Sequence, residues 1–239
     1  MSSLARYAGS LLFTAYLFLS VFVYSIAVLL VGSLSARLGY RVAVFWAGSV
    51  LCLLQILCRL DYVVEGAEHL DRENCVVLLK HSSSWETIAQ FKIFPRQTWV
   101  MKRELLWAPI LGWVLRLLGS IAIDRKAGRA AVERVIVKGR ERLEQGYWVM
   151  IFPEGTRVSP GQVGRYGLGG ALLGIASGRP IIPVAHNAGE FWPRRGWLKR
   201  PGTIRLVIGA PIQTGGRDPR ELTNEVQQWI ESNVAAMGR

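Results

Sequence analysis

Two long runs without a charged residue occupy the first quarter of the chain, one from Ala8 to Val31 and one from Val42 to Cys58. A helix needs about 20 apolar residues to cross the hydrocarbon layer of a bilayer, so the first run is long enough and the second is near the lower limit. A signal peptide fits poorly, because the first run is too long and no cleavage site clearly follows it. Buried core helices should carry polar stripes, and these runs show almost none. We therefore predict two membrane helices, either spanning or re-entrant.

A segment over residues 32–41 separates the two runs, and Gly39 within it is the expected turn residue. Positive charge flanks both runs on every side, so the positive-inside rule favours neither orientation. The flanking residues are Arg6, Arg37, Arg41 and Arg59. A hairpin within one leaflet and a pair of spans are both compatible with this pattern. We expect residues 1–58 to be a membrane anchor and residues 59–239 to form one globular domain.

After residue 59, short β-branched and aliphatic runs alternate with amphipathic segments. The predicted strands are 76–79, 98–101, 121–123, 147–152, 181–185 and 203–208. The predicted helices are 86–94, 109–118, 129–145, 168–177 and 219–235. The last helix carries Leu222, Val226, Trp229, Ile230 and Val234 at helical spacing, which is typical of core contacts. Strands that alternate with helices predict an α/β fold with a mainly parallel or mixed sheet flanked by helices.

The chain is strongly basic, with 29 Lys and Arg against 17 Asp and Glu and a formal net charge of +12. Such a balance favours an anionic partner, which could be nucleic acid, an anionic membrane surface or a phosphorylated substrate. The three cysteines are scattered and show no CxxC spacing, so neither a disulfide framework nor a zinc site is indicated. A reduced cytosolic environment is the simpler interpretation.

One loop interleaves basic and aromatic residues, which suits the headgroup region of a membrane. It contains Trp192, Arg194, Arg195, Trp197, Lys199 and Arg200. Nucleic-acid binding gives a similar pattern. The two uncharged N-terminal runs favour the membrane, so we expect contact with anionic lipids and no nucleic-acid partner.

A polar cluster follows the predicted strand 76–79 directly, and within it His81 and Glu86 lie five residues apart. Ligands of open α/β sheets gather beyond the carboxyl ends of strands, so this position favours a site. The two side chains can meet only if His81 lies in the strand-to-helix turn and Glu86 in the first helical turn. A carboxylate that holds an imidazole in one tautomer makes it a better base. Ser83 and Glu86 also match a capping box, which needs no catalysis to explain it.

Three further segments carry chemically useful residues at expected strand ends. Residues 152–157 read Phe-Pro-Glu-Gly-Thr-Arg, where Pro and Gly favour a tight turn that presents Glu154 and Arg157. Arginine suits phosphate, because its planar fork donates two parallel hydrogen bonds. The other segments are 101–105 with 123–125, and 182–189 with a proline and a histidine. His69, His81 and His186 show no metal-ligand spacing, so no metal or other cofactor is indicated.

Together these segments resemble the four motifs of the glycerolipid acyltransferase family, and specifically those of the bacterial 1-acyl-glycerol-3-phosphate acyltransferases. The resemblance extends from about Tyr62 to Ile212. The combination of His-x4-Glu and Phe-Pro-Glu-Gly-Thr-Arg, in this order and about seventy residues apart, is a highly specific signal. The resemblance implies that His81 is the general base and Glu86 its acidic partner. It also implies contacts with a phosphorylated acceptor, from residues spread over the second, third and fourth motifs. These residues are Lys102, Arg103, Arg125, Glu154, Gly155, Thr156, Arg157 and Pro183.

The implied reaction moves an acyl group from acyl-CoA or acyl carrier protein to the sn-2 hydroxyl of lysophosphatidic acid, giving phosphatidic acid. The implied location is the cytoplasmic membrane, with the catalytic domain on its cytoplasmic face. The sequence departs from the family pattern twice, since most members have Asp at the position of Glu86 and many have Lys near Gly167. Other lysolipid acceptors, such as lyso-ornithine lipid or a lysophospholipid, therefore stay open. A basic membrane-surface or nucleic-acid-binding protein without catalysis is a remote alternative, which would leave the motifs unexplained.

Overall fold

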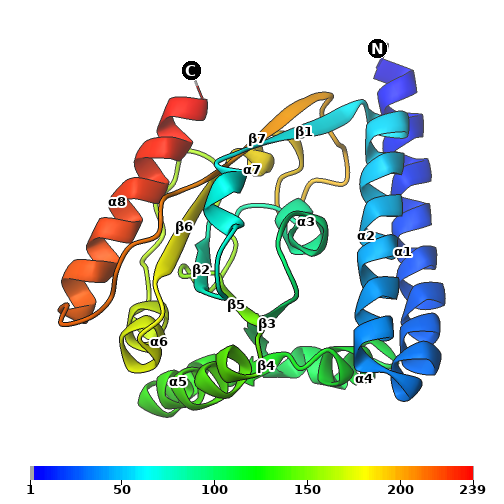
Figure 1. The fold of residues 1–239 in the computed structure, drawn as a ribbon. Coiled ribbons are helices and arrows are strands. Elements are labelled where there is room, and N and C mark those ends of the chain that lie inside the picture. The colour runs from blue at the N-terminus through cyan, green and yellow to red at the C-terminus, as the bar shows by residue number, and fades with distance from the viewer. Residues whose placement is uncertain (1–2, 239) are drawn as a thin grey trace.

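The N-terminal runs form a helical hairpin along one side of the computed structural model, which describes residues 3–238 (Figure 1). Helix α1 spans Ser3–Leu34 and helix α2 spans Ala36–Cys58. Both are long and apolar enough to be candidate membrane spans by length and composition, as predicted. The break between them is a single residue, Ser35, whose side chain accepts a hydrogen bond from the Leu38 amide.

The expected turn at Gly39 is wrong, because Gly39 lies inside α2. It is needed for a close helix contact instead. A Cβ atom at position 39 would lie 2.8 Å from the Cα atom of Gly32 on α1. Gly9 serves the same purpose near the other end of the hairpin, where a Cβ atom would lie 2.1 Å from the Leu57 carbonyl oxygen. The glycines therefore allow two bulky apolar helices to pack backbone against backbone.

The rest of the chain builds a seven-stranded sheet with the order β1-β7-β6-β2-β5-β3-β4. The strands are β1 Leu60–Glu65, β2 Val76–Leu79, β3 Gln97–Lys102, β4 Ile121–Ile123, β5 Trp148–Ile151, β6 Ile181–His186 and β7 Gly202–Ile208. All neighbouring pairs are parallel except β6 and β7. The predicted α/β class with a mixed sheet is confirmed, and the six predicted strands are present with small differences at their ends.

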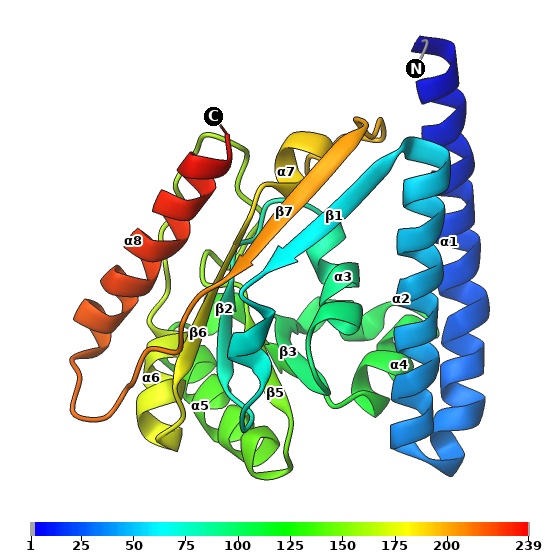
Figure 2. The same cartoon turned by 45° about the horizontal axis from the view of Figure 1, so that its top comes forward.

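Strand β1 was not predicted, because it is short and contains Asp61 and Glu65, and acidic residues are uncommon in strands. Its side chains alternate between buried or half-buried and exposed positions, and it pairs with β7 from Leu60 opposite Gly202 to Glu65 opposite Val207. Figure 2 shows β1 and β7 side by side, running away from the end of the hairpin. The partner strand lies about 140 residues further along the chain, so no local pattern could reveal this pairing.

Helices cover both faces of the sheet. The helices of the domain are α3 Trp85–Ile93, α4 Leu111–Leu117, α5 Arg129–Glu144, α6 Gly169–Ser177, α7 Ala188–Phe191 and α8 Pro219–Met237. Short 3-10 turns lie at η1 Ala67–Leu70, η2 Arg103–Trp107 and η3 Arg125–Ala127. One apolar core joins the sheet to α1–α4, and a second joins it to α5, α6 and α8. Alternate residues of β2 enter the two cores, as a strand buried on both sides requires.

The five apolar residues of the last helix pack as predicted. Leu222, Val226 and Ile230 are fully buried against the sheet, and Trp229 and Val234 pack at the edge of the same core. The hairpin is likewise part of a shared core, since Phe13 and Leu54 are buried with residues of β2 and α3. The boundary at residue 58 stays a prediction.

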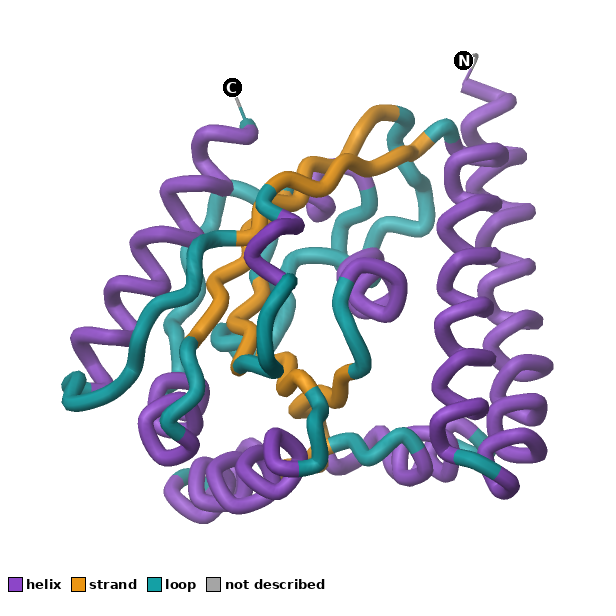
Figure 3. Tube along the Cα trace, viewed as in Figure 1, coloured by secondary structure: helices purple, strands orange, loops and turns teal. Residues whose placement is uncertain are grey.

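The direction of the strands determines at which edge of the sheet the predicted site segments lie. Strands β2, β3, β4, β5 and β6 run the same way, so their carboxyl ends meet at one edge of the sheet. Figure 3 shows the loops, in teal, that connect these strands to the surrounding helices. Residues 80–84, 152–168 and 187 therefore leave the sheet at the same edge.

The glycine contacts of the hairpin lead to a test of its packing. We expect Gly9→Ala to lower the free energy of unfolding by about 1–3 kcal/mol, because the new methyl group must push α2 away from α1. Thermal unfolding of the purified protein in detergent measures this change.

Gly48→Ala is the matched control within the same hairpin, because nothing lies within 4 Å of a Cβ atom at that position. It should be neutral or stabilise α2 by up to about 1 kcal/mol, since alanine favours a helix over glycine. Equal effects of the two substitutions would contradict the close contact at Gly9.

Candidate active site

His81 and Glu86 are brought together at the carboxyl end of β2. The Nδ1 atom of His81, in the turn that joins β2 to α3, lies 2.9 Å from Oε1 of Glu86, in the first turn of α3. An ionised carboxylate can only accept a hydrogen bond, so Nδ1 carries the proton and Nε2 is left free as a base. His81 also borders a cavity, and its ring stacks on Phe152 with 4.0 Å between ring centroids.

Glu86 is completely buried, and its Oε1 atom accepts two further hydrogen bonds. They come from the backbone amides of Ser82 at 3.0 Å and Ser83 at 2.8 Å. Burial alone would raise the pKa of Glu86, but His186, His81 and the Ser83 amide together lower it. Glu86 is therefore an anion held by oriented donors.

The capping box forms only in part. Helix α3 begins at Trp85, and Ser83 Oγ accepts from the Trp85 amide at 3.1 Å while Glu86 reaches back to the Ser83 amide. Glu86 thus makes both contacts that the sequence allowed, the capping contact with the Ser83 amide and the contact with His81.

The loop after β5 closes over the same turn. Gly155 adopts φ 66°, a left-handed conformation that suits glycine, and its amide bonds the Phe152 carbonyl at 3.0 Å. The Val158 amide then donates to the His81 carbonyl at 2.8 Å. These contacts fix Arg157 beside His81, so that both line one cavity.

Glu154 points away from that cavity into a buried ion-pair network. It lies 3.1 Å from Lys80 Nζ and accepts a weak hydrogen bond from the His81 amide at 3.2 Å. Lys80 also pairs with Glu231 of α8 at 2.7 Å, and Tyr166 donates to the same Glu231 oxygen at 2.8 Å. Burial raises the pKa of Glu154 to about 7, although Lys80 opposes this shift.

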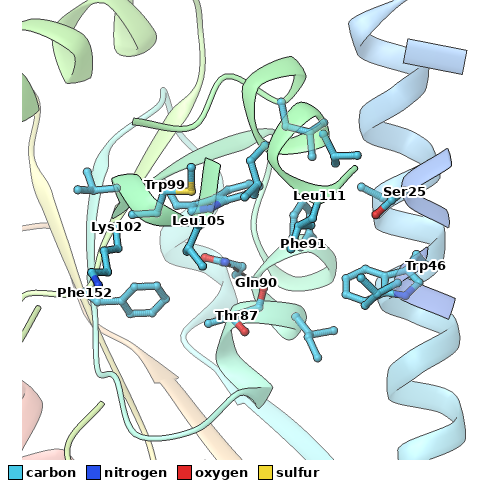
Figure 4. Close-up of a pocket in the computed structure, with 18 of the residues that line it drawn as sticks. Ser25, Trp46, Thr87, Gln90, Phe91, Trp99, Lys102, Leu105, Leu111 and Phe152 are labelled. Atoms are coloured by element: carbon cyan, nitrogen blue, oxygen red, sulfur yellow. Dashed lines mark hydrogen bonds between the residues drawn. The ribbon is translucent and has the colours of Figure 1, made fainter. Parts of the chain in front are cut away.

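The cavity has a volume of about 340 Å³ and lies between the sheet, α3, α4 and the hairpin. Figure 4 shows Lys102 and Phe152 at one end and Ser25 and Trp46, on the hairpin, at the other. Between them the wall is mostly apolar, formed by residues such as Phe91, Trp99, Leu105 and Leu111. The cavity therefore joins a cationic end to a long hydrophobic end.

Three predicted cations line this cavity with His81. Lys102 is the last residue of β3, Arg125 follows β4, and Arg157 follows β5. Nε of Arg157 is buried without a hydrogen-bond partner among the described residues. Burial lowers the pKa of Arg125, although the negative charge of Glu104 opposes this shift. Lys102 lies 3.3 Å from Glu104 on the exposed rim. Together the three side chains can bind an anion.

The remaining predicted binding residues lie outside the cavity lining. Arg103 pairs with Asp124 at 3.0 Å, and Thr156 is exposed. Gly155 shapes the turn, and Pro183 is buried beside Gly209 and Trp229, on the α8 side of the sheet. Direct contacts of these residues with a ligand stay predictions.

The loop over residues 192–200 is only partly a surface patch. Arg194, Arg195, Trp197 and Arg200 are exposed, whereas Trp192 and Lys199 are buried. Lys199 Nζ bonds Thr14 Oγ1 at 2.6 Å on α1, and burial lowers the pKa of Lys199 to about 8. This lysine therefore docks the loop on the hairpin. Its aromatic neighbours in the sequence gave no sign of this contact.

The sequence analysis noted His186 in the fourth motif and gave it no role. The structure buries it at the end of β6, with Nε2 3.8 Å from Oε2 of Glu86. Its position as the last residue of a strand parallel to β2 is the signal that could have placed it there.

Comparisons with known proteins agree with this arrangement. A family model described as Acyltransferase matches residues 61–187. The 1-acyl-sn-glycerol-3-phosphate acyltransferase of Pseudomonas aeruginosa is 41% identical over 203 residues, which cover 83% of this chain and 79% of that protein. The human 1-acyl-sn-glycerol-3-phosphate acyltransferase alpha is 30% identical over 66% of this chain and 57% of its own length. This chain thus spans little more than half of that relative.

A comparison with solved structures also finds this fold. One match is the crystal structure of the 1-acyl-sn-glycerophosphate (LPA) acyltransferase, PlsC, from Thermotoga maritima, with a TM-score of 0.80. The match covers 96% of each chain at 24% identity. The hairpin and the sheet are therefore one known architecture.

The raised pKa of Glu154 predicts a pH-dependent difference in stability. A carboxyl group with a higher pKa in the folded state binds its proton more tightly there, so its contribution to stability falls as pH rises from about 4.5 to about 7. Glu154→Gln, which cannot ionise, should therefore become more stable relative to the wild type across this window. Thermal unfolding of both proteins over a pH series measures the difference. A difference that stays constant with pH would contradict the raised pKa.

Proposed function

Because the chain belongs to the acyltransferase family, we propose that it transfers a fatty acyl group to the sn-2 hydroxyl of 1-acyl-glycerol-3-phosphate, giving phosphatidic acid. The observation that carries this proposal is that His81 and three cations line the same largely apolar cavity. A lysophosphatidic acid has a phosphate, a free hydroxyl and an acyl chain. The cavity offers a partner for each of them.

The phosphate of the acceptor binds Arg157, Lys102 and Arg125. A phosphate monoester carries more negative charge than the phosphodiester of a lysophospholipid, so three converging cations favour it. The free Nε of Arg157 offers a hydrogen-bond donor that the protein itself leaves unused. The acyl chains of the substrates occupy the apolar part of the cavity, toward Trp46 and Ser25 of the hairpin.

His81 acts as the general base. Its Nε2 atom takes the proton of the sn-2 hydroxyl while Nδ1–H donates to Glu86. The alkoxide attacks the carbonyl carbon of the thioester, and the tetrahedral intermediate expels the thiolate. The thiolate then receives the proton from Nε2 of His81. Glu86 stabilises the imidazolium between these two proton transfers.

The donor is an acyl thioester of coenzyme A or of acyl carrier protein. Both carriers are anionic, which suits a protein of net charge +12. No cofactor takes part in this mechanism, because the base and the cations are side chains of the protein.

The protein associates with a membrane through α1 and α2, and we propose that the hairpin lies within the cytoplasmic leaflet. Helix α1 is about 48 Å long at 1.5 Å per residue, and large apolar side chains are exposed along it from Leu4 to Leu34. Helix α2 packs on α3, and α1 packs on α4 at the turn of the hairpin. A hairpin that crossed the bilayer in this arrangement would carry the charged surface of the globular domain into the hydrocarbon, where the cost of removing charges from water is prohibitive.

An acceptor panel tests the function. We expect the purified protein, given one radiolabelled acyl thioester, to acylate lysophosphatidic acid in preference to lysophosphatidylcholine and lyso-ornithine lipid. Arg157→Ala should raise KM for lysophosphatidic acid by about 10- to 100-fold, because a charge-assisted contact with phosphate is lost.

Two variants control this measurement. Arg140→Ala removes an exposed arginine of α5 and should leave KM unchanged, whereas His81→Ala should abolish turnover in a folded protein. Full activity of His81→Ala, or a preference for an acceptor without a phosphate monoester, would reject the proposed function.

Cysteine labelling tests the position of the hairpin. We expect Leu4→Cys and Leu34→Cys, made in a variant without the native cysteines, to react with a membrane-impermeant maleimide only from the cytoplasmic side. The protein covers neither Leu4 nor Leu34, and in this proposal both ends of α1 lie at the cytoplasmic surface of the membrane, where the reagent can reach them. Labelling of one end from each side of the membrane would show a spanning helix instead.

A further inference from the structure

A second histidine lies behind Glu86, on the side away from the substrate cavity. His186 is the last residue of β6, and its side chain is fully buried. Strand β6 pairs with β2 from Val76 opposite Ile181 to Leu79 opposite Val184, so His186 lies beside the turn that carries His81. The proposed chemistry uses His81 and Glu86 and leaves this buried imidazole without a role.

The backbone around His186 selects a single neutral form of the ring. The Ala188 amide lies 3.1 Å from Nδ1 and can only donate, so Nδ1 must be unprotonated. The Lys80 carbonyl lies 2.8 Å from Nε2 and can only accept, so Nε2 must carry the proton. Burial lowers the pKa of His186, although the Glu86 carboxylate opposes this. The ionisable groups around it are Lys80 and His81 after β2, and Glu86 on α3.

The two oxygens of Glu86 have different surroundings. Oε1 accepts from His81 and from the amides of Ser82 and Ser83. Oε2 is buried and has no hydrogen-bond partner among the described residues. Nε2 of His186 lies 3.8 Å from this oxygen, while its N–H group donates to the Lys80 carbonyl. The positive end of a dipole therefore stands next to the buried anion.

From this arrangement we propose that His186 is a positioning residue, which holds the Lys80 carbonyl at the base of the His81 turn and keeps Glu86 ionised without neutralising it. A cation at this position would compete with His81 for the same carboxylate. A neutral N–H group stabilises the anion and leaves its charge available to the imidazolium that forms at His81. His186 does not touch the substrate cavity. The inference rests on the proposed function for its kinetic consequences, but the state of the ring can be measured separately.

The first test is the state of the ring itself. In the full-length protein labelled with 15N-histidine, the resonances of His186 should show an unprotonated Nδ1 and a protonated Nε2 from about pH 5 to about pH 8. The resonances are assigned by their loss in His186→Gln. This measurement needs no substrate, so its result does not depend on the acyl-transfer reaction. A cationic ring, or a proton on Nδ1, would overturn the inference.

The second test compares two substitutions of His186, to Gln and to Asn, each of which can keep one of the two hydrogen bonds of the ring. His186→Gln can place a donor near the Lys80 carbonyl, whereas His186→Asn can accept from the Ala188 amide but is too short to reach that carbonyl. We expect His186→Asn and His186→Ala to lower kcat by about 10- to 100-fold and to leave KM within about twofold of the wild-type value. The reason is that Glu86 stabilises the imidazolium of His81, which forms only during the reaction. His186→Gln should retain kcat within about fivefold.

The pH dependence separates this role from simple packing. Without the N–H group of His186, the negative charge of Glu86 loses one stabilising dipole and attracts a proton more strongly to this site. The fall of kcat/KM at low pH (the acid limb) should therefore move to higher pH in His186→Asn and His186→Ala but not in His186→Gln. Val184→Ala is the matched control on the same strand, where it is buried in the apolar core. It should lower the unfolding temperature and leave the acid limb in place. Equal losses in the Gln and Ala variants, or an unmoved acid limb in both His186→Asn and His186→Ala, would overturn the inference. Absence of acyl transfer by the wild type would instead reject the proposed function.

Discussion

A buried negative charge on Glu86 is the constraint around which this end of the sheet is organised. A carboxylate removed from water is stable only if donors replace its hydration. The turn after β2 supplies two backbone amides, and His81 supplies a third donor. The anion in turn fixes the tautomer of His81 and directs the other ring nitrogen outward. The local fold and the proposed chemistry therefore depend on the same ionised group.

Parallel strand pairing explains how distant segments meet at this charge. Lys102, Arg125 and Arg157 lie at or beyond the carboxyl ends of three different strands, and these strands end at the same edge. The FPEGTR loop adds a direct hydrogen bond to the His81 backbone through Val158. Its glutamate binds Lys80 and the His81 amide and so supports the turn, while a contact of Glu154 with the acceptor stays a prediction. The loop thus combines an arginine that lines the cavity with a carboxylate that binds the turn after β2.

The hairpin is more than an attachment to the membrane, because it also forms a wall of the cavity. Val28 and Trp46 line the same space as His81, and Lys199 ties a loop of the domain to α1. The apolar end of the cavity consequently lies against the helices that we place in lipid. An amphiphilic acceptor can keep its chain in apolar surroundings while its phosphate reaches the cations.

The sequence by itself determined the class of fold, the apolar hairpin and most of the strands and helices, because these follow from local hydrophobic patterns. It also determined which residue types could do the chemistry, since the spacing of His81 and Glu86 and the FPEGTR segment are local motifs. Strand β1, the contact at Gly39 and the burial of Lys199 depend on partners far away in the chain, and no local pattern encodes such partners. Only the tertiary structure decided that Arg157 shares a cavity with His81 while Glu154 turns away from it. It alone placed His186 behind Glu86, because strand order and direction bring together residues about 100 positions apart.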